Sequence, residues 1–168
     1  MTLYAGSPRG SGRIELTAPS GADLISLADT ETWTSAGRSQ TTTASEVERW
    51  THAAQTRDDV VLFEVREDGN PVGQIFLHDI DRGQRESLVG YHLLANGDRD
   101  RGIGTEALAL LVDYARADTD LERLIIITAG ENHRSRRIAE KNGFAFVGPP
   151  KEDPTARCFK LDLDRRTR

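Results

Sequence analysis

Short stretches in which apolar and polar residues alternate, or in which β-branched residues gather, recur through the middle of the chain and near its end. Both patterns predict β-strands. One continuous aliphatic run, LIII at residues 124–127, indicates a strand buried on both faces. The predicted strands cover residues 13–17, 60–66, 72–77, 87–94, 123–128, 144–147 and 157–163.

Apolar residues three and four positions apart predict helices between these strands. The strongest such pattern runs over residues 103–116. Ser45, followed three residues later by Glu48, has the spacing of a capping box and predicts a helix that begins there and continues to about residue 55. Further helices are predicted at residues 23–29 and 132–141, and the Thr- and Ser-rich stretch 30–44 is interpreted as a loop or a short broken helix.

These elements follow one another in the order β-α-α-β-β-β-α-β-α-β-β. An antiparallel meander in the middle of the chain and one late crossover helix predict an α/β fold with a mixed, largely antiparallel sheet flanked by helices. The length of 168 residues suits one hydrophobic core. We therefore expect a single domain over residues 13–163, with a flexible lead at 1–12 and a tail at 164–168.

Composition and charge narrow the class of protein. A net charge of −5 lacks the basic surplus typical of nucleic-acid binders. The longest aliphatic run is far shorter than the ~20 residues of a membrane-spanning helix, and residues 1–12 lack the apolar core of a signal peptide. Cys158 is the only cysteine, and the four histidines have no metal-ligand spacing. We expect a cytoplasmic protein with no nucleic-acid partner, no membrane association and no metal.

The segment that leads into the strongest predicted helix carries two glycines, Gly102 and Gly104, beside Arg99 and Arg101. Glycine lets a backbone approach a ligand closely. The first N–H groups of a helix lack partners within it and lie at the positive end of its dipole, and arginines add charge-assisted donors. The segment is therefore predicted to bind a diphosphate, with a simple surface turn as the alternative.

A further basic cluster opens the helix predicted at 132–141. It is interpreted either as a second phosphate site or as a solvated helix face. It comprises His133, Arg134, Arg136 and Arg137.

The sequence GIGTEA at 102–107 also matches the dinucleotide-binding fingerprint G-x-G-x-x-A. Three features disagree with that interpretation. A polar loop separates the glycines from the preceding strand, the next strand has no acidic residue near position 124 for a ribose, and only one βαβ unit follows. A dinucleotide-binding enzyme is therefore kept only as an alternative.

Several motifs in this half of the chain occur together. Arg99, Gly102 and Gly104 match the pattern R/Q-x-x-G-x-G/A. The other motifs are GYHL at 90–93 for G-Y-W-L, TEAL at 105–108, and NHRS at 132–135 with EKNGF at 140–144 for N-x-x-S…E-K-x-G-F. In motifs and element order the chain resembles the GNAT superfamily of N-acetyltransferases, and within it the branch of the ribosomal-protein N-terminal acetyltransferases.

The resemblance implies an acyl-CoA N-acyltransferase fold, with acetyl-CoA as the cosubstrate and a primary amine as the acceptor. In that fold two neighbouring strands splay apart and the pantetheine arm pairs with strand backbone, which here would be that of Leu93 and Leu94. Asn132 would hydrogen-bond the pantetheine. The residues implied to bind the pyrophosphate are Arg99, Arg101, Gly102, Ile103, Gly104 and Thr105.

The family reacts by direct attack of a neutral amine on the thioester in a ternary complex. Many members have a tyrosine acid where this chain has Ala139, so the resemblance points to Ser135 as the acid and as a cofactor contact. A helix first-turn residue that bonds the backbone is an equal alternative for Ser135. Glu86 and His92 share one face of a predicted strand and are candidate bases. Each also has a structural interpretation, and a weakly basic amine needs no dedicated base.

No motif in the sequence identifies the amine acceptor. A protein N-terminus and a small-molecule amine both stay open, and a homodimer is a general expectation for such a domain. Because Ala139 and the unsettled base leave catalysis unproved, a non-catalytic acyl-CoA-binding or sensing module is a further alternative.

Overall fold

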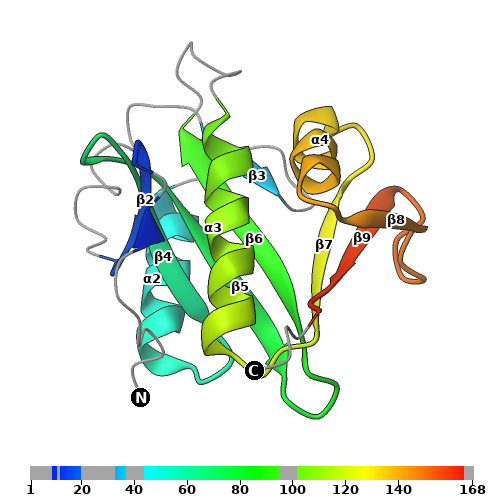
Figure 1. The fold of residues 1–168 in the computed structure, drawn as a ribbon. Helices are drawn as coiled ribbons and strands as arrows, with labels where there is room; N and C mark the ends of the chain where they lie inside the picture. Colours follow the sequence, from blue (N-terminus) through cyan, green and yellow to red (C-terminus); the bar gives the residue numbers. More distant parts are fainter. Residues whose placement is uncertain (1–8, 11, 20–32, 37–43, 95–101, 165–168) are drawn as a thin grey trace.

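A computed structural model describes residues 9–10, 12–19, 33–36, 44–94 and 102–164 (Figure 1). The helix expected at 23–29 and the expected phosphate ligands Arg99 and Arg101 lie outside these residues, so they stay predictions. Within the described residues, no helix is long and apolar enough to cross a membrane.

Nine strands in the described part of the chain form one sheet (Figure 1). Its order is β1-β2-β4-β5-β6-β7-β9-β8, with β3 paired to β6 off this path. Among the described strands, only β6 and β7 run parallel, which confirms the mixed, largely antiparallel sheet expected from the sequence. The strands are β1 (Arg9–Gly10), β2 (Ile14–Thr17), β3 (Trp33–Ala36), β4 (Val61–Glu67), β5 (Asn70–Asp81), β6 (Glu86–Leu94), β7 (Arg123–Ala129), β8 (Ala145–Gly148) and β9 (Ala156–Asp162).

Helices α2 and α3 cover opposite faces of this sheet (Figure 1). Phe63 of β4 lies opposite Ile75 of β5, so the next residue on β5, Phe76, points to the other face. Phe63 packs edge-on against Tyr114 of α3, whereas Phe76 stacks on Trp50 of α2. The described helices are α2 (Ala44–Thr56), α3 (Ile103–Asp118) and α4 (His133–Lys141).

The two parallel strands separate after a short contact. They pair only from Glu86 with Arg123 to Leu88 with Ile125. We call the region beyond these residues, where β6 and β7 no longer pair, the β6–β7 opening. In the chain α3 comes after β6 and α4 comes after β7, so the N-termini of both helices lie beside this opening (Figure 1).

β3 pairs with β6 along the edge where β7 no longer pairs. The sequence pattern predicts a loop or a short broken helix at 30–44, and this is wrong for β3, which pairs antiparallel with β6 from Tyr91 to Leu94. The Thr- and Ser-rich stretch has no alternating pattern that indicates a strand. β3 exists because a distant strand offers it unpaired backbone groups, which only the tertiary structure reveals.

Two other expectations fail. Helix α2 begins at Ala44, so Ser45 lies within the helix and is not its N-cap. The strand before Gly102 is antiparallel to β5, and β6–β7 is the single parallel pair among the described strands. A dinucleotide-binding fold has an open parallel sheet, so that alternative is wrong.

Candidate functional site

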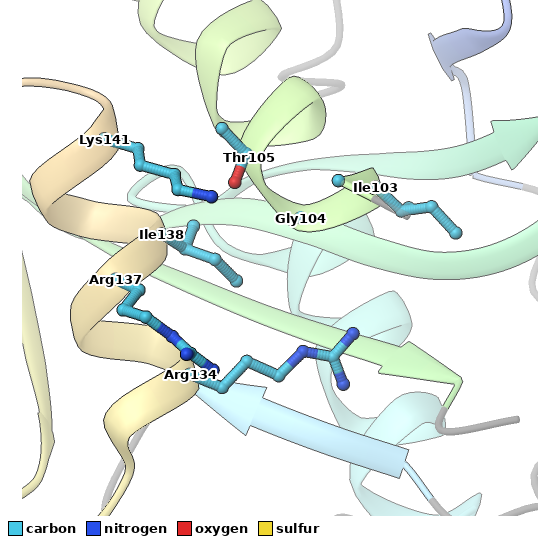
Figure 2. A pocket seen from close by; sticks show the side chains of 8 residues that line it. Ile103, Gly104, Thr105, Arg134, Arg137, Ile138 and Lys141 are labelled. Carbon is cyan, nitrogen blue, oxygen red and sulfur yellow. The ribbon is translucent and has the colours of Figure 1, made fainter. Parts of the chain in front are cut away.

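A pocket of about 290 Å³ lies between the N-terminus of α3 and one side of α4 (Figure 2). Arg134, Arg137 and Lys141 recur at intervals of three and four residues, so they share one face of α4. Figure 2 shows Lys141 extending toward Thr105 at the start of α3. Among the described residues no acidic side chain lines the pocket, so its charge is positive. Its lining consists of Gly102, Ile103, Gly104, Thr105, Arg134, Arg137, Ile138 and Lys141.

The first turn of α3 adds backbone donors to these cations. Gly102 is the N-cap residue, and its carbonyl oxygen accepts a hydrogen bond from the backbone N–H of Glu106 at 3.0 Å. The N–H groups of residues 103–105 precede this bond and have no partner within the helix. Together with the positive end of the helix dipole and three cations, they make a site suited to a phosphate or diphosphate.

Gly102 and Gly104 are required for different reasons. Gly102 has a φ of 76°, a left-handed conformation that costs other L-residues about 1–2 kcal/mol, and a Cβ there would have open space. At Gly104 a Cβ would lie 2.6 Å from Ile138 Cδ1 and 3.0 Å from Leu93 Cδ1. The first glycine therefore shapes the turn, and the second lets α3, α4 and β6 pack closely.

A side chain at the end of α4 fixes this helix against α3. Asn142 Nδ2 donates hydrogen bonds to the carbonyl oxygens of Ile138, at 3.0 Å, and of Thr105, at 3.2 Å. The bond to Thr105 joins the two sides of the pocket. In the sequence, Asn142 is visible only as part of a helix stop signal, and its partner is 37 residues away. Lys141 likewise lies outside the basic cluster noted in the sequence.

Ser135 and Asn132 lie at the start of α4, next to the pocket. Asn132 is the N-cap, and its side chain accepts a hydrogen bond from the backbone N–H of Ser135 at 3.1 Å. The hydroxyl oxygen of Ser135 accepts a hydrogen bond from Tyr91 Oη of β6 at 2.8 Å. Among the described residues, the Ser135 hydroxyl is thus bonded to strand β6 and not to the backbone of α4. The roles expected for Ser135 and Asn132 in catalysis and cofactor binding stay predictions.

The sequence pattern does not identify Tyr91 as a candidate site residue, although Tyr91 belongs to the GYHL motif. It is 3% exposed, and Ser135 is 2% exposed. Burial raises the pKa of Tyr91 to about 12, against a smaller lowering by the hydrogen bond to Ser135 and by the charge of Arg134. The phenol is therefore protonated throughout the physiological pH range.

The structure separates the candidate base Glu86 from the pocket. Glu86 is the first residue of β6, at the end where β6 and β7 still pair. Its carboxylate lies 3.6 Å from the guanidinium of Arg123. Leu93, at the other end of β6, is seven residues further along and so roughly 23 Å away. These positions favour the structural interpretation of Glu86.

His92, the other candidate base, lies on β6 near the opening but points to the face of α2. It is 6% exposed, and its ring centroid is 5.4 Å from that of Phe76. Burial lowers the pKa of His92 to about 4, with Glu46 opposing this shift and Arg49 adding to it. His92 is therefore neutral at pH 7 and only a weak proton acceptor.

The β6 backbone expected to pair with a pantetheine arm already has neighbours on both sides. Leu93 pairs with Gly73 of β5 on one edge and with Thr34 of β3 on the other, and Leu94 pairs with Trp33. An arm can therefore add to this edge only if β3 leaves it. Among the described residues, no cluster of three or more His, Cys, Asp or Glu side chains could hold a metal ion.

Comparison with known sequences identifies relatives. Residues 13–145 match the acetyltransferase (GNAT) domain family. A protein of Bacillus subtilis (strain 168) named ribosomal N-acetyltransferase YdaF is 34% identical over 85 residues, which are 51% of this chain and 46% of YdaF. The N-acetyltransferase YjcK of the same organism is 33% identical over 81 residues, covering 48% of this chain and 45% of YjcK. The matched part thus spans about half the length of these curated relatives.

Solved structures share the fold at low sequence identity. RimL, a ribosomal L7/L12 α-N-protein acetyltransferase in complex with coenzyme A, has a TM-score of 0.72 at 17% identity, covering 95% of this chain and 99% of RimL. The microcin C7 self-immunity acetyltransferase MccE, solved with acetyl-CoA and AMP, has a TM-score of 0.69 at 16% identity, covering 90% of this chain and 93% of MccE. With strands that separate beside a cationic pocket, and with a family match over most of its length, this chain belongs to the GNAT acetyltransferase domain family.

Proposed function

We propose that this protein transfers the acetyl group of acetyl-CoA to a primary amine. The pocket between α3 and α4 carries the proposal, because its backbone donors and three cations suit a diphosphate. When bound there, the thioester would supply an activated acetyl group beside the β6–β7 opening. An arm that pairs with the backbone of Leu93 competes with β3 for the same edge.

The reaction we propose is direct attack by a neutral amine in a ternary complex. Neither candidate base suits deprotonation of the amine, since Glu86 is ion-paired at the far end of β6 and the low pKa of His92 makes it a weak base. We infer that water takes the amine proton. Ser135 is the acid that protonates the departing thiolate, because its hydroxyl lies at the start of α4 beside the pocket residue Arg134.

We propose a peptide N-terminus as the acceptor. An α-amino group has a pKa of about 7.7–8.0, whereas a lysine side chain has a pKa of about 10.4, so far more of the α-amine is neutral at pH 7. This difference suits a site with no effective base. The names of YdaF and RimL, which refer to ribosomal and L7/L12 acetylation, support the same acceptor class for their relatives.

Ligand-induced stabilisation tests the cofactor. A ligand that binds only the folded protein adds about 2.7 kcal/mol at 100 times its Kd, which raises the Tm by several degrees. We expect acetyl-CoA and CoA to raise the Tm, and NAD and NADP to leave it unchanged. No shift with acetyl-CoA would contradict the proposal.

Release of CoA thiol tests the transfer and the acceptor. The panel contains a short peptide with a free N-terminus, the same peptide N-acetylated but carrying one lysine, and a polyamine. We expect turnover with the first at pH 7 and much slower turnover with the others. Binding of acetyl-CoA without turnover of any amine would favour the non-catalytic acyl-CoA-binding alternative.

A further inference from the structure

One buried hydrogen bond joins the two sides of the β6–β7 opening. Tyr91 lies on β6 and Ser135 on α4, and their hydroxyl oxygens are 2.8 Å apart. Both side chains are almost fully buried, at 3% and 2% exposure. The neighbouring residue Arg134 lines the cationic pocket, so the pair lies directly beside the predicted cofactor site.

The direction of this bond follows from burial. A buried phenol needs an acceptor for its proton, and in the described residues the one hydrogen-bond partner of Tyr91 Oη is Ser135 Oγ. Tyr91 therefore donates and Ser135 accepts. The backbone N–H of Ser135 is already bonded to Asn132.

Among the described residues, no group accepts the proton of Ser135. A serine hydroxyl has one donor and two lone pairs, and Tyr91 occupies one lone pair. No hydrogen bond from Ser135 Oγ to another group of the described residues accompanies it. The hydrogen bond from Tyr91 thus prevents the Ser135 proton from pointing toward β6, and that proton can point in other directions.

We propose that Tyr91 is a positioning residue that directs the proton of Ser135 toward the leaving thiolate. This inference rests on the proposed function. As the amine nitrogen bonds to the acetyl carbon, the carbon–sulfur bond breaks and the sulfur takes the Ser135 proton. The proton that the amine loses returns to Ser135 through water, and Tyr91 keeps its own proton throughout. Donation from Tyr91 also disperses the negative charge that forms on the Ser135 oxygen.

The competing interpretation is that the bond only holds β6 against α4. The two interpretations predict different changes in kcat, because a bond that only holds β6 against α4 has the same effect whether or not Ser135 is the acid. A positioning residue acts only through the Ser135 hydroxyl. A double-mutant cycle therefore separates them.

The experiment compares Tyr91→Phe, Ser135→Ala and the double variant by kcat, by KM for acetyl-CoA and by Tm. Loss of one hydrogen bond in the transition state predicts about a tenfold fall in kcat for Tyr91→Phe, with KM for acetyl-CoA within about twofold. In the Ser135→Ala background, Tyr91→Phe is expected to leave kcat unchanged. Tyr114→Phe, which removes the same atom from a buried tyrosine of α3, is the matched control and keeps full kcat.

Three results would overturn the inference. The first is an equal fall in kcat from Tyr91→Phe in both backgrounds, and the second is an equal fall in kcat in Tyr91→Phe and in the control Tyr114→Phe. The third is full activity of Ser135→Ala while the wild-type protein acetylates peptides, which would refute this inference and leave the proposed function intact. A wild-type protein that acetylates no amine would instead refute the proposed function itself.

Discussion

The two faces of β6 carry different chemistry although they belong to the same strand. On the face of α3 and α4, Leu93 packs near Gly104, Tyr91 bonds Ser135, and the cationic pocket lies beside them. On the face of α2, His92 lies against Phe76, whose ring occupies the space that a side chain at position 90 would fill. The first face is cationic beside the pocket and suits an anion, whereas the second is partly aromatic and carries the neutral His92.

Buried polar residues cross the sheet on the α2 face. Glu64 of β4 lies opposite Gln74 of β5, which lies opposite His92 of β6. Both Glu64 and Gln74 have no exposed surface, and Glu64 forms an ion pair with Arg66 at 2.6 Å. The Gln74 amide makes no hydrogen bond within the described residues. Polar groups buried in this way reduce stability, unlike the half-buried or exposed cations of the other face.

This difference explains why the phosphate-binding segment is predictable from the sequence, whereas the arrangement of the α2 face is not. A diphosphate needs charge and backbone donors, which a short motif around a helix N-terminus supplies. The α2 face is assembled from single residues on three strands and a helix. Variants on each face test this comparison, and they follow here in order of expected effect.

The largest effect is expected on the α3–α4 face from Arg134→Ala combined with Arg137→Ala. Each charge-assisted hydrogen bond is worth about 1.5–3 kcal/mol, so the pair should weaken acetyl-CoA binding by roughly 100-fold or more. Calorimetric titration at two salt concentrations measures this change. Arg136→Ala, outside the pocket lining, is the control. Equal loss in the control would refute the assignment of the pocket.

The two glycines should respond differently. At Gly104 the β-carbon of valine would overlap Ile138, and overpacking costs about 1–3 kcal/mol, so Gly104→Val should lower both Tm and acetyl-CoA affinity. In Gly102→Ala the new β-carbon would lie in open space, so the free energy of unfolding should fall by about 1–2 kcal/mol through the left-handed backbone alone. Thermal unfolding with and without acetyl-CoA measures both. A Gly104→Val protein of unchanged Tm would contradict the packing role.

On the α2 face, His92 should make the protein sensitive to acid. Its pKa is about 4 when folded and about 6.5 when unfolded, so the unfolded state binds more protons between these values and stability falls as the pH falls. Between pH 7 and pH 5 this costs about 2 kcal/mol. Urea unfolding at both pH values should show a smaller loss for His92→Gln than for the wild type, with the exposed His52→Gln as control. An equal pH dependence in all three proteins would contradict the buried neutral state.

The smallest effect should be a gain in stability. Gln74→Met replaces a buried amide that makes no hydrogen bond in the described residues with an apolar chain of similar length. Removing an unsatisfied polar group should raise stability by about 1 kcal/mol, or the Tm by about 2–4 °C. Thr128→Val on β7, where a buried hydroxyl also lacks a partner among the described residues, is the matched variant. A lower Tm in Gln74→Met would mean that the amide supports the fold.

Local sequence patterns were enough to predict most of the described strands and helices. The hairpin of β4 and β5 is visible because its turn contains Asp68 and Gly69, which both adopt positive φ. Helix α3 is visible from its apolar stripe, and the helix predicted at 132–141 agrees with the observed α4. The same reasoning misassigned β3, because each of its residues pairs with a residue of β6 that is 55 to 61 positions further along the chain, from Ala36 with Tyr91 to Trp33 with Leu94.

By itself, the sequence determined the family, the glycine turn and the described strands and helices other than β1 and β3, since these depend on residues close together in the chain. The tertiary structure decided which cations face the pocket, how closely Gly104 packs against Ile138 and Leu93, and that Tyr91 and Ser135 meet. It also separated Glu86 from the site and buried His92 in a way that lowers its pKa. These properties arise from distances and burial between segments far apart in sequence, and no local pattern encodes them.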